Sequence, residues 1–338
     1  MELELVLCDD RPSVRNTHNE SLGHVAVVGA GSIGVGWAVV FARAGLAVRL
    51  QDLHAGRLEL AAGDIRTRLD ALAEYGLLDE AAATVAARVT LCTGLAGAVA
   101  GARHVQECAP EDLPLKRDLF ATLDGLLPAG VALASSSSAL VTTEIAARLE
   151  GRERCLVVHP GNPPYLLPVV EVVPAPFTDP GVVDRTVSLL EDCGMTPVRL
   201  AMEIEGFVFN RLQGALLREA YCLVGDGVAT VDDIDRVVRT GLGRRWAVLG
   251  PFETADLNTR GGIAEHAARL GPAYARMGAE RGQDDPWTPE LVAKVTAARR
   301  AALPLDHWDA AVERRDRTLM ALERARRAFE PEVTHGAR

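Results

Sequence analysis

Two ionisable residues stand alone inside apolar, β-branched runs in the middle of the chain. His159 ends the run that starts at Cys155, and Glu171 lies within the run 168–173. Such runs are typical of strands buried on both faces, where an unpaired charge is costly. If the two strands pair, the carboxylate can hydrogen bond one imidazole nitrogen and raise the basicity of the other. The pair therefore has the chemistry of a general base near neutral pH, and a structural ion pair is the alternative.

A glycine-rich turn near the amino end predicts a second kind of chemistry. The turn follows the apolar run 24–28 and opens a helical pattern over 33–44. Gly29 permits a tight turn, Gly31 lets the backbone approach a pyrophosphate, and Gly34 lets the helix pack on the strand. A glycine turn without a ligand is the alternative. The predicted cofactor contacts in this turn are Gly29, Gly31, Ser32, Ile33 and Gly34.

The acid that follows the second expected strand indicates which dinucleotide binds. Asp52 comes directly after the run 47–51, where a carboxylate accepts hydrogen bonds from the adenosine ribose. A carboxylate there would repel the 2′-phosphate of NADP, so the expected cofactor is NAD. Arg57 could neutralise that repulsion, although a surface salt bridge is its simpler role.

The strands and helices that would position these residues can be predicted from the alternation of segment types along the chain. From residue 24, short β-branched runs alternate with longer stretches rich in alanine, leucine and arginine. This alternation predicts an α/β fold with a Rossmann-type doubly wound sheet and helices on both faces. The stretch 56–87, broken at Gly76, predicts a helical pair inserted between the second and third strands. The expected strands are 25–28, 47–51, 89–92, 104–108, 131–134, 155–158 and 169–173.

After about Glu203 the strand-like runs disappear, and the pattern predicts an all-helical C-terminal domain. The last helical pattern, 314–327, is dense in charge and would be a solvated face or an ionic dimer seam. The expected helices are 208–224, 231–240, 264–270, 289–302 and 307–329. The predicted organisation is an N-terminal extension (1–21), an NAD-binding domain (22–203), a helical domain (204–330) and a tail (331–338).

Composition limits the class of partner and the compartment. A chain of 338 residues is long enough for two domains, and its net charge of -10 argues against nucleic acid or an anionic membrane as partner. Small molecules are the expected ligands. The six scattered cysteines show no metal-ligand spacing, so we expect reduced thiols and no metal.

Two observations bear on location. The first residues lack the basic start of a signal peptide. The uncharged stretch 25–42 just reaches the length of a membrane span, but its four glycines favour a strand, a turn and a helix. A cytoplasmic protein is expected.

These motifs together resemble the 3-hydroxyacyl-CoA dehydrogenase family. Beyond the glycine turn, three features are similar to the lambda-crystallin branch, which includes L-gulonate 3-dehydrogenase. They are the segment His159-Pro-Gly-Asn-Pro-Pro-Tyr-Leu-Leu-Pro168, then Glu171, and then the segment Gly206-Phe-Val-Phe-Asn-Arg-Leu212. The resemblance runs from about residue 22 to residue 325. Two departures are Gly161, where the branch usually carries a larger apolar residue, and the uniform serine quartet 135–138. The glycine would loosen the substrate pocket.

The resemblance implies roles for five residues of the reacting site. His159 matches the catalytic histidine and Glu171 the acid that orients it. Ser138 matches a serine that hydrogen bonds the reacting oxygen, and it could also cap a helix. Asn162 and Asn210 match two asparagines that line the site, although each is also an ordinary loop or cap residue.

Three further residues are implied as cofactor or substrate contacts. Glu111 and Lys116 match positions near the nicotinamide and its ribose. Lys116 and Lys294 are the only lysines among 36 basic residues, which points to a site role, although composition drift would leave a few lysines anywhere. Arg245 matches an arginine of the sugar-acid and carnitine branches and could grip a free carboxylate; a salt bridge between domains is the alternative.

The implied activity is the NAD-dependent interconversion of the 3-hydroxy and 3-oxo forms of a small hydroxy acid, as in L-gulonate 3-dehydrogenase. A 3-hydroxyacyl-CoA dehydrogenase is the alternative, with Arg57, Arg66 and Arg68 as candidates to bind CoA phosphates. A carnitine-like substrate would need an aromatic cage, and a non-catalytic crystallin-like role is the third possibility. The resemblance also implies a homodimer through the helical domain. The candidate cage residues are Trp37, Tyr165, Trp246 and Phe252.

Overall fold

The structure is a computed structural model that describes residues 23–247, 249–258, 262–281, 290, 297, 301 and 304–329. The expected extension 1–21, the tail 331–338 and most of the expected helix 289–302 lie outside the described residues. The chain divides into two compact units. The first comprises the chain up to Asn210 together with the residues from Glu313 onward, and the second comprises Arg211–Val312.

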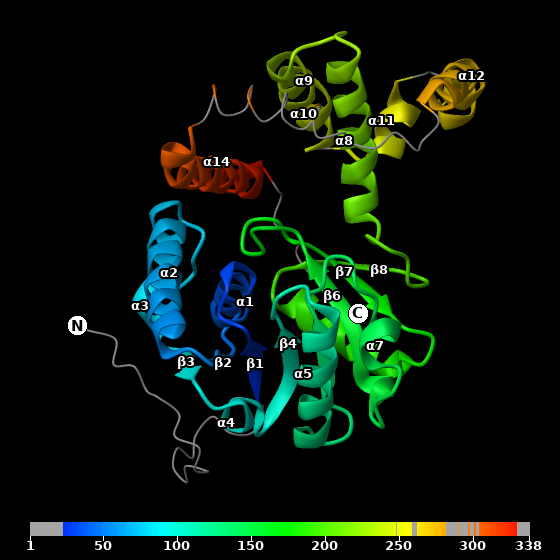
Figure 1. The fold of residues 1–338 in the computed structure, drawn as a ribbon. Coiled ribbons are helices and arrows are strands. Elements are labelled where there is room, and N and C mark those ends of the chain that lie inside the picture. Colours follow the sequence, from blue (N-terminus) through cyan, green and yellow to red (C-terminus); the bar gives the residue numbers. More distant parts are fainter. Residues whose placement is uncertain are drawn as a thin grey trace, which may run out of the picture. The chain divides into compact units, whose positions relative to one another are not determined.

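An eight-stranded sheet forms the centre of the first unit, in the order β3-β2-β1-β4-β5-β6-β7-β8 (Figure 1). Every neighbouring pair is parallel except β6 and β7, which are antiparallel. The predicted Rossmann-type sheet is confirmed. The strands are β1 (His24–Val28), β2 (Val48–Gln51), β3 (Val89–Cys92), β4 (Ala102–Glu107), β5 (Ala132–Ser135), β6 (Cys155–Pro160), β7 (Val169–Pro174) and β8 (Thr196–Arg199).

Two features of this sheet were not predicted. β7 runs antiparallel to β6 because residues 161–168, which join them, are too few for the crossover of about a dozen residues that parallel pairing needs. β8 escapes a pattern search because it is a short strand at the sheet edge that contains Pro197 and is largely exposed.

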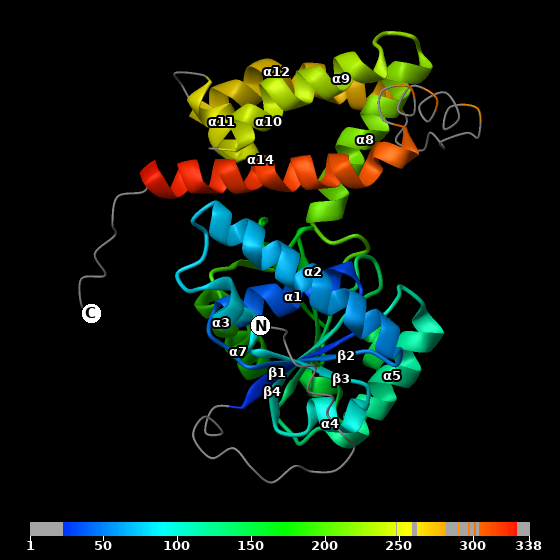
Figure 2. The ribbon, with the colours of Figure 1, turned by 90° about the vertical axis from the view of Figure 1, so that its left-hand side faces the viewer.

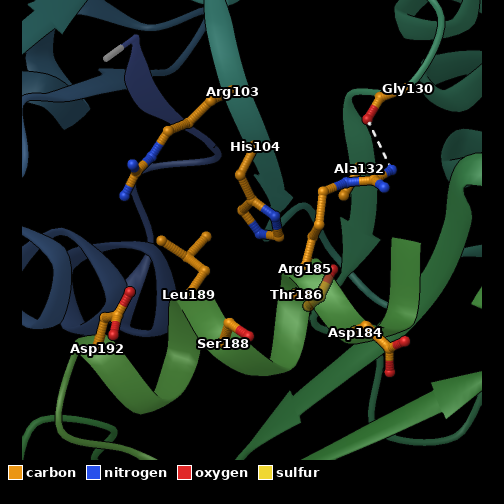
Figure 3. Close-up of a pocket in the computed structure, with 10 residues that line it drawn as sticks. All are labelled: Arg103, His104, Gly130, Ala132, Asp184, Arg185, Thr186, Ser188, Leu189 and Asp192. Atoms are coloured by element: carbon orange, nitrogen blue, oxygen red, sulfur yellow. Dashed lines mark hydrogen bonds between the residues drawn. The ribbon is translucent and has the colours of Figure 1, made fainter. Parts of the chain in front are cut away.

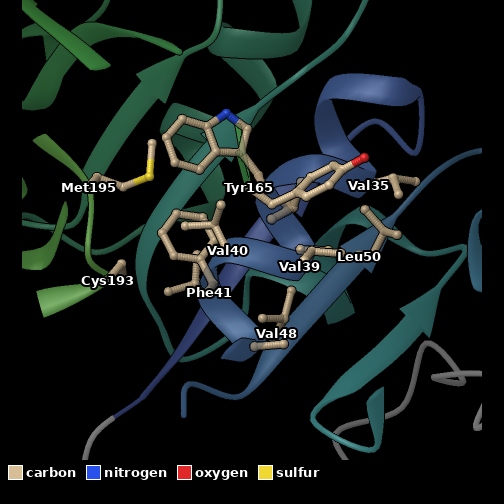
Figure 4. Close-up of a cluster of buried hydrophobic side chains, with 14 of the residues drawn as sticks. Val35, Val39, Val40, Phe41, Val48, Leu50, Tyr165, Cys193 and Met195 are labelled. Atoms are coloured by element: carbon tan, nitrogen blue, oxygen red, sulfur yellow. The ribbon is translucent and has the colours of Figure 1, made fainter. Parts of the chain in front are cut away.

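Helices cover both faces of the sheet, and two clusters of buried side chains hold them there (Figure 2). The larger cluster joins β1 and β2 to α1, α2 and α7, and Figure 4 shows part of it around Phe41 and Tyr165. The smaller cluster joins β1, β4 and β5 to α4, α5 and α6. The helices are α1 (Ser32–Arg43), α2 (Ala55–Glu74), α3 (Ala82–Ala86), α4 (Leu95–Val99), α5 (Leu113–Leu126), α6 (Thr142–Ala146), the 3-10 turn η2 (Arg152–Arg154) and α7 (Pro180–Asp192).

The inserted helical pair is confirmed as α2 and α3, between β2 and β3. The break occurs where expected, because Gly76 follows α2 with φ of 67°, a left-handed conformation that glycine adopts at little cost.

The last helix, α14 (Trp308–Phe329), differs from the expectation, which placed it wholly in the helical domain. Its residues from Glu313 onward belong to the first unit. Met320 is buried in the larger core cluster, Asp316 accepts a hydrogen bond of 2.9 Å from the Tyr165 hydroxyl, and Arg317 pairs with Glu74 of α2 at 3.1 Å. An apolar anchor therefore fixes this charge-dense helix beside α2, as Figures 1 and 2 show.

The second unit is helical, as predicted. Its described residues contain only two buried side chains, Val224 and Thr254, so they form almost no core of their own. No described helix has both the length and the apolar composition of a membrane span. The elements are α8 (Phe209–Gly225), which begins in the first unit, then α9 (Val231–Val237), the π-turn η3 (Val238–Leu242), α10 (Gly243–Trp246), α11 (Pro251–Leu257) and α12 (Gly262–Arg281), with the 3-10 turn η4 (Leu305–His307) before α14.

Candidate active site

His159 and Glu171 face each other across the only antiparallel pair of the described sheet. The register of β6 and β7 places the two residues directly opposite, and His159 Nδ1 lies 2.8 Å from Glu171 Oε2. Both side chains are buried, with residue exposures of 6% and 3%. The expectation that the two strands pair and that the two residues satisfy each other is confirmed.

Two backbone donors complete the environment of Glu171. The N–H groups of Val208 and Phe209 donate to Glu171 Oε1 at 2.7 and 2.9 Å. Burial acts to raise the pKa of Glu171, but the hydrogen bonds from His159 and from these two N–H groups outweigh it, so the pKa lies below its usual value. The carboxylate stays ionised, and an ionised carboxylate can only accept. His159 therefore carries a proton on Nδ1, and Nε2 is the ring nitrogen left to exchange a proton with a ligand.

The segment that supplies these donors has an unusual backbone. Gly206 and Phe207 both have positive φ, 73° and 50°, and Phe207 is fully buried. The ring of Phe207 lies 5.4 Å from the His159 ring, and that of Phe209 lies 6.2 Å from it. The turn therefore aims two backbone donors at Glu171 and packs aromatic rings around the imidazole. The sequence motif drew attention to this segment but not to its backbone donors.

Three of the four consecutive serines are committed to separate structural contacts. The Ser135 hydroxyl donates at 2.6 Å, the Ser136 hydroxyl accepts two hydrogen bonds at 2.8 and 3.0 Å, and the Ser137 hydroxyl donates at 2.5 Å. The partners are Glu107 for Ser135, Gln106 and Trp37 for Ser136, and Glu111 for Ser137. Each of these three hydroxyls thus joins the end of β5 to a different part of the fold, which gives three of the four serines a structural role.

Ser138 differs from the other three. It is exposed, and its hydroxyl has no hydrogen bond to any part of the chain that the structure describes. Its backbone is held instead: its N–H donates to Glu111 at 3.0 Å and its carbonyl accepts from Asn210 Nδ2 at 2.9 Å. The alternative helix-capping role of Ser138 is not seen, because α6 begins at Thr142 after Val141 without a side-chain cap; the Ser137 hydroxyl accepts from the N–H of Leu140 at 2.8 Å within a turn. The Ser138 hydroxyl is therefore left for a ligand.

Glu111 and Lys116 lie next to this serine segment. Glu111 Oε1 accepts from the N–H groups of Ala139 and Leu140 at 2.9 and 3.2 Å, in addition to its two serine contacts. Burial acts to raise the pKa of Glu111, but these hydrogen bonds and the Lys116 charge lower it overall. Lys116 Nζ lies 3.9 Å from Glu111 Oε2 and has its closest contacts with Glu107, at 2.8 and 3.0 Å. Lys116 is only 1% exposed.

The glycine turn has the shape that a dinucleotide requires. Gly29 has φ of 104°, and a Cβ there would lie 2.8 Å from the Cys108 backbone. A Cβ at Gly34 would lie 1.8 Å from the Gly29 carbonyl, so the helix approaches the turn more closely than any side chain allows. A Cβ at Gly31 would meet nothing within 4 Å, which leaves open space where α1 begins at Ser32. The residues present therefore fit a pyrophosphate at the helix N-terminus.

Asp52 supports the same turn. Its Oδ2 accepts from the N–H of Ala30 at 3.1 Å and its Oδ1 from the N–H of His54 at 3.0 Å. Arg57 lies 3.9 Å from Asp52 and its side chain is 56% exposed, so it forms the surface salt bridge that was its simpler interpretation. A carboxylate so oriented can still accept from ribose hydroxyls, because each oxygen has two lone pairs.

Arg68, a candidate for CoA phosphates, is already engaged. Its guanidinium lies over the Tyr165 ring at 5.4 Å, donates to the Ser32 carbonyl at 3.4 Å and lies 4.0 Å from Asp64. Trp37 and Tyr165 are also buried, at 0% and 5% exposure, so neither presents an open ring face. The other candidate cage residues, Trp246 and Phe252, belong to the second unit and are 41% and 81% exposed.

Three further sequence-predicted positions can be placed. Asn162 is exposed two residues after the end of β6, before a cis peptide bond to Pro163. Gly161 is buried, and a Cβ there would lie 3.0 Å from Leu167, so the missing side chain leaves no space beside this glycine. The expected loosening of the pocket is therefore not seen at this point. Arg245 is exposed on α10 in the second unit.

A pocket of about 390 Å³ lies elsewhere, between α7 and the amino-terminal parts of β4 and β5 (Figure 3). It is lined by His104, Arg103 and Arg185 among others, and it contains none of the predicted site residues. Among the described residues, no group of three or more histidine, cysteine or acidic side chains could hold a metal ion, and the five described cysteines form no disulfide.

Comparison with known proteins settles the family. The model of the 3-hydroxyacyl-CoA dehydrogenase, NAD binding domain, matches residues 24–204, and that of the 3-hydroxyacyl-CoA dehydrogenase, C-terminal domain, matches residues 206–302. The chain belongs to the 3-hydroxyacyl-CoA dehydrogenase family. The resemblance deduced from the motifs is thereby confirmed, and this family member is an NAD-dependent dehydrogenase.

Three relatives of this dehydrogenase illustrate the range of the family. Lambda-crystallin of Oryctolagus cuniculus is 39% identical over 314 residues, which cover 92% of this chain and 98% of the relative. L-carnitine dehydrogenase of Streptomyces griseus is 40% identical over 277 residues, which cover 80% of this chain and 79% of the relative. The solved structure of 5-formyl-3-hydroxy-2-methylpyridine 4-carboxylic acid 5-dehydrogenase, an NAD+-dependent dismutase, has a TM-score of 0.76 and 29% identity, covering 91% of this chain and 99% of that one.

Proposed function

We propose that this dehydrogenase interconverts the 3-hydroxy and 3-oxo forms of a small free hydroxy acid, in the manner of L-gulonate 3-dehydrogenase. The observation that carries the proposal is the buried pair of His159 and Glu171, in which the carboxylate fixes the imidazole tautomer. Ser138, with its uncommitted hydroxyl, and Asn210, which holds the Ser138 carbonyl, lie in the same unit. Together these residues form the constellation of an acid or base with a polarising hydroxyl.

Each residue has a defined step in alcohol oxidation. His159 Nε2 takes the proton of the substrate hydroxyl, while Glu171 stabilises the imidazolium that forms by keeping its hydrogen bond to Nδ1. The glycine turn and Asp52 would hold NAD, which would supply the hydride acceptor for the carbinol carbon. The hydroxyl of Ser138 and the amide of Asn210 polarise the developing carbonyl, and Asn162 lines the site. In the reverse direction the imidazolium returns the proton.

The contacts that two arginines already make within the protein favour a free acid over a CoA thioester as the substrate. Arg68 is held by Tyr165, Asp64 and the Ser32 carbonyl, and Arg57 is paired with Asp52, so two of the three cations proposed for CoA phosphates are engaged. Arg245 remains for a carboxylate, which a guanidinium binds in bidentate fashion. We expect Arg245→Ala to raise KM for a free acid while its exposed neighbour variant, Arg244→Ala, leaves KM unchanged. An unchanged KM in Arg245→Ala would refute the anchor.

Two other functions deserve a test, the first because one relative is named L-carnitine dehydrogenase. A carnitine-type substrate is a variant of the same chemistry, but the buried Trp37 and Tyr165 cannot form a cage for its ammonium group. A non-catalytic role is the less favoured possibility, because Ser138, His159, Glu171 and Asn210 are all present, and the hydrogen bonds His159–Glu171 and Asn210–Ser138 support the catalytic alternative.

We also propose that the second unit carries the substrate anchor and forms a homodimer. A helical unit with almost no core of its own needs a partner surface, and its apolar side chains are largely exposed. Those more than half exposed are Leu212, Val228, Val237, Phe252, Leu257, Tyr274 and Met277. Sedimentation analysis tests this proposal, and a monomer at micromolar concentration would contradict it. We also propose a cytoplasmic location, which the free thiols of the five described cysteines support.

A substrate screen tests the function directly. Purified protein with NAD is assayed by NADH absorbance against L-gulonate, 3-hydroxybutyrate, carnitine and 3-hydroxybutyryl-CoA. We expect turnover with a free hydroxy acid and weaker or no turnover with the thioester. A preference for the thioester would establish the acyl-CoA alternative, and NADH binding without turnover of any 3-hydroxy compound would favour the non-catalytic one.

A further inference from the structure

A short linker, residues 200–208, joins β8 to α8 and ends at the two N–H groups that donate to Glu171. Two buried side chains, Leu200 and Phe207, fasten it to one small apolar cluster on β6 and β7. Between these two anchors most side chains are exposed. The course of the linker over the surface therefore depends on its polar contacts.

The turn at the end of this linker has a conformation that needs support. Phe207 has φ of 50°, in the left-handed region, which a bulky residue adopts only where surrounding contacts hold it there. Its N–H donates to the carbonyl of Ile204 at 3.1 Å. A change in this turn would redirect the next two N–H groups, which are the ones that donate to Glu171. The environment of Glu171 thus depends on what holds the linker before Phe207.

Glu203 joins the linker to α6. Its Oε1 accepts from the backbone N–H of Thr143 at 2.8 Å, and its Oε2 accepts from the Thr143 hydroxyl. Thr143 is the second residue of α6, and the residue before that helix, Val141, makes no side-chain cap. Glu203 therefore supplies an acceptor for the helix start from 60 residues away, at the end of a helix that favours a carboxylate.

The start of α6 and the linker approach each other at two further points. Val141, directly before α6, packs against the apolar cluster that contains Phe207. Asn210, at the start of α8, donates to the Ser138 carbonyl at 2.9 Å. The linker is thus held against the loop that carries the predicted site serine, and Glu203 supplies the charged contact of this set.

We propose that Glu203 is a positioning residue: by holding the linker on α6, it keeps the two N–H groups at the end of the linker directed at Glu171. Its own partner is Thr143, so it acts on the site through the backbone. This inference rests on the proposed role of Glu171 and His159, but one of its tests, hydrogen exchange, requires no substrate.

Weaker donation to Glu171 would have an electrostatic signature. Burial acts to raise the pKa of Glu171, and the hydrogen bonds from His159, Phe209 and Val208 lower it overall. His159 is the titratable group that faces this carboxylate, at 2.8 Å. A carboxylate with weaker backbone donors is more basic, so the pair of His159 and Glu171 would hold its shared proton to a higher pH.

The experiment compares Glu203→Ala with Glu144→Ala in the full chain. Glu144 is an exposed acid in the first turn of the same helix, and its side chain makes no hydrogen bond or ion pair with any described residue. The two variants therefore remove the same charge and differ in the contact that is lost. Amide hydrogen exchange is measured over residues 204–210, together with the NADH Kd, kcat and the pH dependence of kcat/KM for alcohol oxidation.

For Glu203→Ala we expect exchange over 204–210 to be faster and kcat to be lower, each by about 10-fold, which corresponds to one charge-assisted hydrogen bond. The acid limb of the kcat/KM profile should move to higher pH by about half a unit or more. The NADH Kd should stay unchanged, because the glycine turn is untouched. Glu144→Ala should match the parent protein in all four quantities.

Thr143 provides an independent pair of variants. Thr143→Ser keeps both donors to Glu203 and should match the parent protein. Thr143→Val keeps the N–H and loses the hydroxyl, so it should change exchange and the acid limb in the same direction as Glu203→Ala, by a smaller amount. These two quantities in Thr143→Val decide the matter if Glu203→Ala does not fold.

Equal exchange rates in Glu203→Ala and Glu144→Ala would overturn the proposal. An acid limb that stays in place while Glu203→Ala loses stability would overturn it too, because that is the result of a purely structural contact. The proposed function fails separately, if His159→Ala keeps the parent rate, and the exchange rates still decide the role of Glu203 in that case.

Discussion

Replacing Glu171 by glutamine should invert the tautomer of His159. Oε1 of Glu171 accepts from two backbone N–H groups, those of Val208 and Phe209, and Oε2 accepts from His159 Nδ1. A glutamine has one acceptor oxygen and one NH2 group. If its oxygen keeps the two backbone donors, its NH2 group faces Nδ1, which must then be an acceptor. The proton moves to Nε2, and the nitrogen that should take the substrate proton can no longer do so.

The size of the effect follows from what is lost. General acid–base catalysis contributes about 100- to 10,000-fold in rate, and a histidine held in the wrong tautomer loses most of it, so kcat should fall by about that factor. Two of the three hydrogen bonds to Glu171 persist in the glutamine variant. We therefore expect a loss of only about 1 to 3 kcal/mol in unfolding free energy.

The assay measures kcat from NADH absorbance and the NADH Kd from fluorescence, on Glu171→Gln and on a control, Glu150→Gln, which alters an exposed carboxylate. The first variant should lose turnover and keep NADH affinity, and the control should keep both. If Glu171→Gln retains kcat within about threefold of the parent, far short of the general-base contribution, the tautomer argument is wrong.

Asp52→Ala should weaken NADH binding by about 10- to 100-fold and reduce the preference for NADH over NADPH, because a charged acceptor of ribose hydrogen bonds is lost; an unchanged ratio of the two Kd values would exclude this role. Burial lowers the pKa of His104 to about 4 from its ordinary 6.5, so the unfolded chain takes up this proton first, and stability is lost as pH falls from 6.5 toward 4. The loss is up to about 3 kcal/mol, and urea unfolding at pH 7 and pH 4 should show a smaller difference for His104→Leu; an equal difference would contradict the assignment. Gly34→Ala should cost at least about 3 kcal/mol of unfolding free energy, since its Cβ would lie 1.8 Å from the Gly29 carbonyl, whereas Gly31→Ala should fold normally and weaken NADH binding; equal stabilities would show that the close approach is not needed.

Residue types and spacing predicted those strands of the sheet that are apolar and rich in β-branched residues. The valine-rich runs before His159 and around Glu171 predicted two buried strands whose pairing would bring the two residues together, but the antiparallel direction of that pairing was not predicted. β8 was missed because an exposed edge strand with Pro197 lacks that pattern. The placement of α14 could not be predicted, since Met320 and Leu319, which pack against the larger cluster, lie in a sequence that is otherwise dense in charge.

The site was predicted less completely than the fold, for a physical reason. His159 and Glu171 can be recognised in the sequence by their ionisable side chains. The backbone N–H groups of Val208 and Phe209 cannot, because every residue type except proline has such a group. Glu107 has the same problem in another form. In the sequence it is an ordinary acidic residue at the end of a strand. Only the tertiary structure shows that three parts of the chain donate hydrogen bonds to its carboxylate.

The most direct measurement concerns His159 itself. In a single turnover with NAD bound and substrate in excess, the rate of NADH formation reports hydride transfer, which depends on removal of the hydroxyl proton. For His159→Ala we expect an unchanged NADH Kd and a rate at least about 100-fold below that of the parent protein. A rate close to that of the parent would show that another group takes the proton and would contradict the proposed role of the pair.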